Sequence, residues 1–415
     1  MTGDPSRACP NPTFYHTGWP APNAHFRQPS YCRSMCFRVL KRNLEEGGSL
    51  SLVDRAGGMW VDRDRGRGLD PVSLEHLAPD LFSNQEALPL DRTQPFKVAC
   101  VQAASVFLDL DASVEKAQSV IGEAGSKGAR LVVFPEAFLP GYPVWVWVIP
   151  PGHTHPLREL YSELHANSVT LPGPETERLG RAAAAAGTAV AIGVNERNSE
   201  GSDSSLYNTL LFLGPDGEIL GRHRKLIPTA GERLVWSQGD GSDLEVYDLP
   251  FGRVGGLICW ENYMPLARYA LSAWGEQIHA APTWDRGEPW LSTMRHVAKE
   301  GRSFVLGACQ ALHLDDIPDR FSFKKKYMEG MDGWVNPGHS VIVDPDGKIL
   351  AGPAVEEETI LFAEIEPDQL VGPRWQLDVA GHYARPDVFE LRVHRRKAPF
   401  VRIVEEEPEG DDPSK

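Results

Sequence analysis

The chain has 415 residues, of which 41% are hydrophobic and 24% are charged, and these values exclude a wholly disordered or collagen-like protein. With 42 Lys and Arg against 57 Asp and Glu, the net charge is −15, which argues against a general nucleic-acid binder because phosphate neutralisation requires a basic face. No apolar run approaches the roughly 20 residues that a membrane-spanning helix needs.

Residues 1–95 differ in texture from the rest, since they show no sustained helical or strand period. Basic and acidic side chains balance in this segment, so the negative charge falls on the remainder of the chain. Closely spaced prolines at its start prevent the amphipathic helix of a transit peptide. We predict a disordered or loosely attached extension, or an artefact of an upstream start codon with Met59 as the internal start; a docking arm is the alternative.

From Phe96 onward, strand-like and helical segments alternate, which predicts an α/β domain over 96–370 with sheets covered by helices. The apolar run 131–134 is typical of a strand buried on both faces. The expected strands are 96–103, 131–134, 188–194, 206–213, 254–259, 278–281, 303–308 and 340–343, and the expected helices are 113–129, 158–166, 175–185, 265–274 and 290–301.

Two segments, 211–221 and 341–352, share the pattern strand, Pro-Asp-Gly turn, strand. Proline supplies the turn φ and glycine the positive φ, so both segments are predicted hairpins and suggest a fold with related halves. Residues 371–415 are expected to form a C-terminal extension. It contains a strand-like alternation at 389–393 and an acidic stretch at 405–412, which we expect to be a solvated, disordered end.

The cysteines indicate a reducing compartment, and we expect the cytoplasm. The chain is long, and no signal peptide is recognisable. The spacing of Cys32 and Cys36 lacks a second Cys or His pair, which argues against a zinc site. Free thiols are therefore expected at Cys9, Cys32, Cys36, Cys100 and Cys309, while Cys259 has further features.

Cys259 follows the small-residue strand 254–258 and precedes a predicted helix. A cysteine at such a turn projects from the end of the sheet, near the positive end of a helix, where thiolate is favoured. The same position also suits an inert core thiol, and a nucleophile requires a base and a group that stabilises negative charge.

Three charged residues could supply these groups. Glu136 follows the buried strand 131–134, Lys225 ends the second strand of the first hairpin, and Glu232 lies in the next loop. Each has an ordinary explanation, as a helix-start glutamate, a surface lysine or a loop carboxylate. Their combination with Cys259 suggests a catalytic centre.

The combination resembles the nitrilase (carbon–nitrogen hydrolase) superfamily over about 96–387. The similarity is carried by Phe134-Pro-Glu136, by Arg224-Lys225-Leu-Ile-Pro-Thr229-x-x-Glu232-Arg233 and by Gly256-Leu-Ile-Cys259-Trp-Glu-Asn262, in the order and spacing of the three superfamily motifs. Supporting pieces lie at 193–197, 207–209, 281–285 and 381–387.

The resemblance implies a four-layer αββα sandwich with a Glu–Lys–Cys centre that works without metal or cofactor. Cys259 would be the nucleophile, Glu136 the general base and acid, and Lys225 the cation that stabilises developing negative charge. Glu232 would orient Lys225 and assist proton transfer.

The segments 259–265, 281–285 and 381–387 look like the nitrilase branch, whose members convert a nitrile and water to a carboxylic acid and ammonia. Cyanide hydratases and dihydratases, and aliphatic amidases of the same superfamily, are the alternatives, because the same residues serve them. His339 departs from the expected motif; it could reach the pocket, and a structural role is the alternative.

Aromatic residues near these motifs suggest a substrate pocket. Tyr142, Trp260 and Trp284 could line a site for an aromatic or arylaliphatic nitrile, and a role as core or interface aromatics is equally consistent with the sequence. The resemblance also implies homo-oligomers in which dimers extend into spirals. Candidate contacts are the helix after Cys259, the helix 158–166 and the segment 389–393.

Overall fold

The computed structural model describes residues 94–331 and 333–397. The N-terminal extension apart from its last two residues, its three cysteines and the acidic tail lie outside these ranges. None of the helices within the described ranges is both long and apolar enough to cross a membrane.

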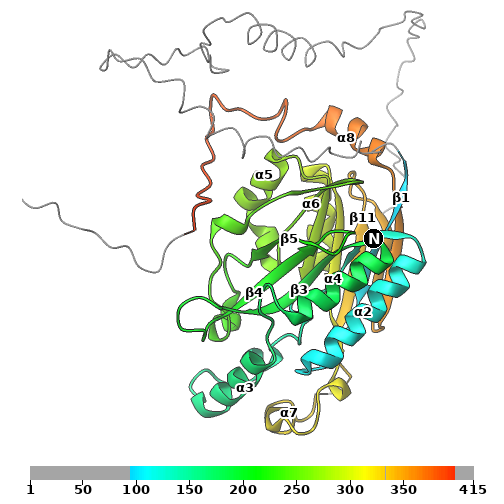
Figure 1. Cartoon of the computed structure of the whole chain (residues 1–415). Coiled ribbons are helices and arrows are strands. Elements are labelled where there is room, and N and C mark those ends of the chain that lie inside the picture. The colour runs from blue at the N-terminus through cyan, green and yellow to red at the C-terminus, as the bar shows by residue number, and fades with distance from the viewer. Residues whose placement is uncertain (1–93, 332, 398–415) are drawn as a thin grey trace, which may run out of the picture. The chain divides into compact units, whose positions relative to one another are not determined.

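Two β-sheets form the centre of the described fold (Figure 1). In each sheet the middle strands are parallel (β1, β2 and β3 in one, β7, β8 and β9 in the other) and the outer ones antiparallel. The first sheet has the order β13 (Thr359–Ile365), β1 (Phe96–Gln102), β2 (Ala129–Val133), β3 (Ala189–Arg197), β4 (Leu206–Leu213) and β5 (Ile219–Arg224). The second has β10 (Ala311–His313), β11 (Trp334–Val343), β9 (Phe304–Cys309), β8 (Ile278–Thr283), β7 (Gly252–Gly256) and β6 (Tyr247–Leu249), with β12 (Ile349–Val355) also paired to β11.

Helices cover the outer face of each sheet, which confirms the predicted αββα layers. On the first sheet, α2 (Leu110–Ser126) and α4 (Pro174–Ala186) share one hydrophobic cluster with the strands beneath them. On the second, α6 (Gly287–Gly301) packs on β8, β9 and β11, and α5 (Pro265–Ala273) forms a smaller cluster beside it. Outside these layers lie α3 (Thr154–Ala166), α7 (Ser322–Tyr327) and α8 (Val371–Gln376).

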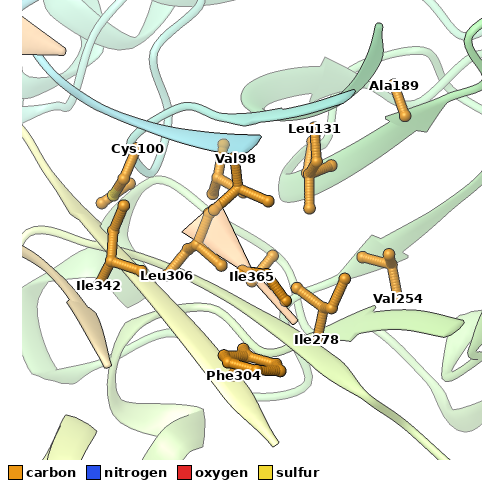
Figure 2. Close-up of a cluster of buried hydrophobic side chains, with 14 of the residues drawn as sticks. Val98, Cys100, Leu131, Ala189, Val254, Ile278, Phe304, Leu306, Ile342 and Ile365 are labelled. Atoms are coloured by element: carbon orange, nitrogen blue, oxygen red, sulfur yellow. The ribbon is translucent and has the colours of Figure 1, made fainter. Parts of the chain in front are cut away.

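A hydrophobic core fills the space between the two sheets (Figure 2). Successive residues of β1 and β2 alternate between this core and the helix-facing cluster: Leu131 and Val133 point inward, and Val132 points to the helices. Because both faces of a central strand are buried, its sequence reads as a continuous apolar run. This explains why 131–134 was recognisable as a buried strand.

Most predicted elements are present, with shifted ends. Both Pro-Asp-Gly segments are antiparallel hairpins, β4–β5 and β11–β12, one in each sheet. The helix expected at 113 begins at Leu110, because the Asp109 carboxylate accepts a hydrogen bond from the Ala112 N–H and caps it. The strand expected over 254–259 ends at Gly256. The segment 389–393, with its strand-like alternation, pairs with no strand of the described chain and packs Leu391 and Val393 near α5.

Gly256, at the end of β7, lies close to strands of both sheets. A Cβ atom there would lie 2.5 Å from the Ala280 carbonyl oxygen on β8 and 2.9 Å from Leu210 Cδ2 on β4 of the other sheet. Both distances are shorter than carbon contacts allow, and a backbone carbonyl cannot rotate away as a flexible side chain can. Only glycine therefore fits at this position without separating the strands.

We expect Gly256→Ala to lower the free energy of unfolding by about 1–3 kcal/mol, because the added methyl overpacks the space between the sheets. Gly122→Ala is the matched control, since nothing lies within 4 Å of its Cβ position on α2. That change should raise stability by about 0.5–1 kcal/mol through helix propensity. Urea unfolding of both variants measures the difference, and equal effects would contradict the close approach at Gly256.

Candidate active site

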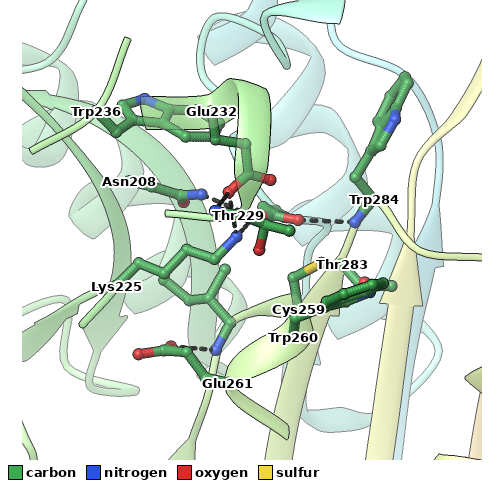
Figure 3. Close-up of polar contacts among 12 residues, drawn as sticks. Asn208, Lys225, Thr229, Glu232, Trp236, Cys259, Trp260, Glu261, Thr283 and Trp284 are labelled. Atoms are coloured by element: carbon green, nitrogen blue, oxygen red, sulfur yellow. Dashed lines mark hydrogen bonds and ion pairs between the residues drawn. The ribbon is translucent and has the colours of Figure 1, made fainter. Parts of the chain in front are cut away.

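The four predicted catalytic residues come together at loops that follow strands of both sheets, and Figure 3 shows three of them, Lys225, Glu232 and Cys259. Glu136 follows β2 and Lys225 follows β5 in the first sheet, while Cys259 follows β7 in the second. Glu232 lies on the short 3₁₀ helix Ala230–Leu234. One carboxylate oxygen of Glu136, one of Glu232 and the sulfur of Cys259 lie within 4.8 Å of one another.

The Lys225 ammonium lies between the two carboxylates. Its Nζ is 2.7 Å from Glu136 Oε1 and 2.7 Å from Glu232 Oε2, and the three side chains are almost completely inaccessible to solvent. Burial alone would lower the pKa of this lysine, but the Glu136 and Glu232 carboxylates outweigh it and raise the pKa above its usual value. Lys225 is therefore a permanent cation in the site.

The Glu136 carboxylate accepts hydrogen bonds on both oxygens. Asn208 Nδ2 donates to Oε1 at 2.7 Å together with Lys225, and the Trp284 backbone N–H donates to Oε2 at 2.7 Å. Burial raises the pKa of Glu136 to about 6, although the Lys225 ammonium acts to lower it. A carboxyl with a pKa near neutrality can accept a proton and return it.

Hydrogen bonds to both of its carboxylate oxygens restrict the orientation of Glu232. Its Oε2 accepts from Lys225 and from the Thr229 N–H at 2.6 Å, and its Oε1 accepts from the Tyr142 hydroxyl at 2.8 Å. Thr229 caps the 3₁₀ helix that carries Glu232, so the local turn itself directs the carboxylate at Lys225.

Cys259 begins the 3₁₀ helix Cys259–Tyr263 and has a φ of 54°, which is in the left-handed region that non-glycine residues seldom adopt. The helix α5 begins only at Pro265, after this turn. Burial and the Glu136 carboxylate raise the pKa of the thiol, while Lys225 and the Thr283 side chain oppose them and do not prevail. The raised pKa favours a thiol over the thiolate expected from the sequence, so attack requires transfer of the thiol proton.

Among the described residues, one group of three acidic or thiol side chains has the spacing of a metal site, namely Glu136, Glu232 and Cys259. The Lys225 ammonium already donates to both carboxylates at hydrogen-bond distance. A metal ion in this space would meet a fixed positive charge that competes for the same oxygens. The arrangement fits proton transfer better than metal binding.

A pocket of about 520 Å³ opens onto Cys259, and its lining includes all three predicted substrate residues. Tyr142 and Trp284 stack with ring centroids 4.2 Å apart and an interplanar angle of 2°. Trp260 is half exposed at the rim, where its indole N–H donates to Asp285 Oδ2 at 3.0 Å. The pocket wall is otherwise mostly apolar, with Val144, Trp147, Val148, Met328, Met331 and Val335.

Sequence reasoning missed several of these residues. Asn208 on β4 lies in the supporting motif piece 207–209 but was given no role there, and its side chain donates to Glu136. Gln310 donates from Nε2 to the Glu136 backbone oxygen at 2.7 Å, and its position just after β9 was the available signal. Met328 and Met331 carry no local pattern that marks a pocket. His339 does not line the pocket, and its Nδ1 lies 2.9 Å from the Gly338 carbonyl oxygen, so it has the structural role considered above.

Comparison with known proteins places this architecture in a family. The model of the carbon–nitrogen hydrolase family matches residues 97–372. An aliphatic nitrilase of Sinorhizobium fredii (strain HH103) is 44% identical over 317 residues, covering 76% of this chain and 97% of that protein. Nitrilase 2 of Arabidopsis thaliana is 42% identical over 329 residues, covering 77% and 95%. A bifunctional nitrilase/nitrile hydratase of Nicotiana tabacum is 41% identical over 329 residues, covering 78% and 93%.

Solved structures share the fold at lower identity. The NitFhit protein of C. elegans aligns with a TM-score of 0.54 at 21% identity, covering 74% of this chain and 69% of that one. An amidase from Nesterenkonia sp. AN1 aligns with a TM-score of 0.51 at 18% identity, covering 69% and 95%. At these identities the similarity concerns the fold alone.

We expect the reaction of Cys259 with iodoacetamide to accelerate as the pH rises through about 6, because the Glu136 carboxyl ionises there and can then accept the thiol proton. Mass spectrometry of the peptide containing Cys259 measures the rate at each pH. Glu136→Gln should remove this rise, whereas Glu123→Gln, at an exposed carboxylate on α2, should retain it. An unchanged profile in Glu136→Gln would contradict the assignment.

Proposed function

Since the chain belongs to the carbon–nitrogen hydrolase family and to its nitrilase branch, we propose that Cys259, Glu136, Lys225 and Glu232 are the residues with which it hydrolyses an organic nitrile to a carboxylic acid and ammonia. The observation that carries the assignment is the buried ammonium of Lys225, 2.7 Å from each of two carboxylates and beside the only described thiol that faces the pocket.

The first step joins the substrate to the enzyme. Cys259 Sγ attacks the nitrile carbon, one C–N π bond becomes a lone pair on nitrogen, and an S–C bond forms. Glu136 accepts the thiol proton and delivers it to that nitrogen, which gives a thioimidate. The Lys225 ammonium stabilises the negative charge that develops on nitrogen, in the manner of an oxyanion hole.

Two waters complete the reaction. Water adds to the thioimidate carbon while Glu136 takes its proton, and the protonated nitrogen leaves as ammonia to give a thioester. A second water hydrolyses the thioester to the acid and restores the thiol. Glu232 holds the Lys225 ammonium in place by accepting a hydrogen bond from it. The other carboxylate oxygen of Glu232 accepts a hydrogen bond from Tyr142, which belongs to the pocket wall. If the tetrahedral intermediate expels the thiol in place of ammonia, an amide results, so product analysis reports the partition.

We further propose that the substrates are aromatic or arylaliphatic nitriles. The Tyr142–Trp284 pair, the ring of Trp260 and the apolar side chains that complete the pocket form a lining that suits a flat ring, and its 520 Å³ accommodates one. One carboxylate oxygen of Glu136 and one of Glu232 lie within 4.8 Å of the Cys259 sulfur, beside which the nitrile carbon would lie.

We expect ammonia release from phenylacetonitrile and benzonitrile. Their kcat/KM should be roughly tenfold or more above that of a small aliphatic nitrile or cyanide, because each apolar group that a hydrophobic pocket buries adds binding free energy. Cys259→Ala should lose activity by about 10⁴-fold or more. Cys100→Ala is the control, since this thiol is buried in the core between the sheets.

Matching amides belong in the same panel. Turnover of amides without nitriles would move the function to an amidase, and a preference for aliphatic nitriles or cyanide would reject the proposed substrate class alone.

We also propose that the protein forms homo-oligomers, in which dimers extend into spirals. Hydrophobic side chains are exposed on α5 and on the segment after α8: Leu266 is 68% exposed and Phe389 77%. Between α5 and this segment lies a groove of about 840 Å³. Arg268 on α5 donates to the Asn262 carbonyl oxygen at 2.6 Å, and the Asn262 side chain donates to the Cys259 carbonyl oxygen. An interface on α5 would therefore stabilise the loop that carries the nucleophile.

We expect Leu266→Glu to shift the protein toward smaller species in analytical ultracentrifugation and to lower the activity per chain, because a charge would be buried in the interface. Leu350→Glu on β12, also at an exposed leucine, is the control and should retain the assembly. A wild-type protein that is monomeric at all concentrations with constant activity per chain would reject the proposal.

For localisation we propose the cytoplasm. The three described cysteines, Cys100, Cys259 and Cys309, are free thiols, and the proposed nucleophile requires its thiol to stay reduced.

A further inference from the structure

We propose that Glu261, together with His223, is a positioning clamp that fixes Lys225 and Cys259 relative to each other from behind the active site. The inference rests on the proposed nitrilase mechanism and adds residues that do not touch the substrate. Glu261 and His223 are 2% exposed, and neither lines the pocket.

The Glu261 carboxylate connects the neighbours of the two catalytic residues. Its Oε1 accepts from the Leu226 N–H at 2.7 Å, and Leu226 directly follows Lys225. Its Oε2 accepts from the Ile258 N–H at 2.8 Å, and Ile258 directly precedes Cys259. Figure 3 shows Glu261 below Lys225 and Cys259, on the side away from Glu232. A single side chain thus holds both loops at the residue beside the reactive group.

These two loops belong to different sheets. Lys225 follows β5 of the first sheet, whose ladder ends at Arg224, and Cys259 follows β7 of the second, whose ladder ends at Gly256. Strand hydrogen bonds therefore do not set the distance between the two residues. The carboxylate of Glu261 supplies a connection across the sandwich at this position.

His223 on β5 adds charge to the clamp. Its Nε2 lies 2.9 Å from Glu261 Oε2 and 3.2 Å from Oε1. Burial would raise the pKa of the Glu261 carboxyl, but His223 and the two backbone N–H groups lower it. Burial would likewise lower the pKa of His223, and the Glu261 carboxylate raises it. The contact between the sheets is therefore an ion pair with two charge-assisted hydrogen bonds to backbone.

Asn262 holds the same loop in a different way. Its Nδ2 donates to the Leu257 and Cys259 carbonyl oxygens at 2.9 Å, and His279 of β8 lies 2.7 Å from its Oδ1. All of these partners belong to the second sheet or to the loop itself. They stabilise the positive φ of Cys259, whereas Glu261 relates that loop to the lysine of the other sheet.

Loss of the clamp should affect the chemical step more than binding. A thiol and an ammonium that are displaced by a fraction of an ångström no longer meet the same nitrile carbon and nitrogen, and such misplacement costs about 10- to 100-fold in rate. Because neither clamp residue lines the pocket, KM should change little.

The test compares Glu261→Gln with Glu196→Gln. Glu196 is also a buried carboxylate and pairs with Arg222 and Arg224, but its partners all belong to the first sheet. Glu261→Gln replaces one of the two carboxylate oxygens, each of which accepts from a backbone N–H, with an NH₂ group that cannot accept. We expect kcat for phenylacetonitrile to fall about 10- to 100-fold, while KM stays within about threefold of the wild-type value. Glu196→Gln, with a comparable loss of stability, should keep kcat within about threefold.

The rate of Cys259 alkylation by iodoacetamide gives a second readout that does not depend on nitrile turnover. It should fall in Glu261→Gln and not in Glu196→Gln. Equal losses in both variants would overturn the clamp, because they would reflect stability alone. Alkylation that differs between the variants while the wild type releases no ammonia would reject the nitrilase mechanism and retain the clamp.

If Glu261→Gln does not fold, His223→Gln replaces it, since glutamine keeps a donor and removes the charge. A fall in kcat of about fivefold or more at constant KM supports the clamp, and an unchanged kcat overturns it.

Discussion

The buried ammonium of Lys225 is the interaction on which the rest of the site depends. A buried cation is tolerated only when anionic partners surround it, and here two carboxylates each lie 2.7 Å away. Two carboxylates around one cation leave an excess of negative charge. Together with burial, this raises the pKa of Glu136 to about 6 and raises the pKa of the Cys259 thiol. The raised pKa therefore favours a proton on the Cys259 sulfur, and the Glu136 carboxylate is close enough to accept it.

The four residues come from two sheets, so the packing of the sandwich is part of the active site. At Gly256 the second sheet lies close to Leu210 on β4 of the first sheet, and the Trp284 N–H, which follows β8, donates to the Glu136 carboxylate of the first sheet. Glu261 adds a connection on the opposite side of Lys225. A core substitution between the sheets would consequently be felt in catalysis as well as in stability.

The nucleophile loop is where local expectation and structure diverge. An apolar run through 254–258 reads as a strand that continues to Cys259, but the ladder stops at Gly256 and the chain turns into a 3₁₀ helix with Cys259 at φ 54°. Hydrogen bonds from Asn262 and to Glu261 maintain that conformation. Periodicity cannot reveal it, because side-chain bonds to the backbone, and not the hydrophobic pattern, make the turn.

The sequence by itself determined most of the central strands and the two hairpins, because these are local patterns. Its motifs, through their resemblance to a known superfamily, indicated the αββα layers and the candidate residues Glu136, Lys225, Glu232 and Cys259. Only the tertiary structure decided which aromatic residues line the pocket. It assigned Tyr142 and Trp284 to the pocket and Trp145 to the core with Phe107 and Phe323, and it added Met328 and Met331 from a distant loop. The distance between Lys225 and Cys259 and the direction in which burial shifts the pKa of the thiol were likewise beyond the sequence. These properties depend on how two sheets pack and on which charges they bury together, and such long-range contacts leave no period in the chain.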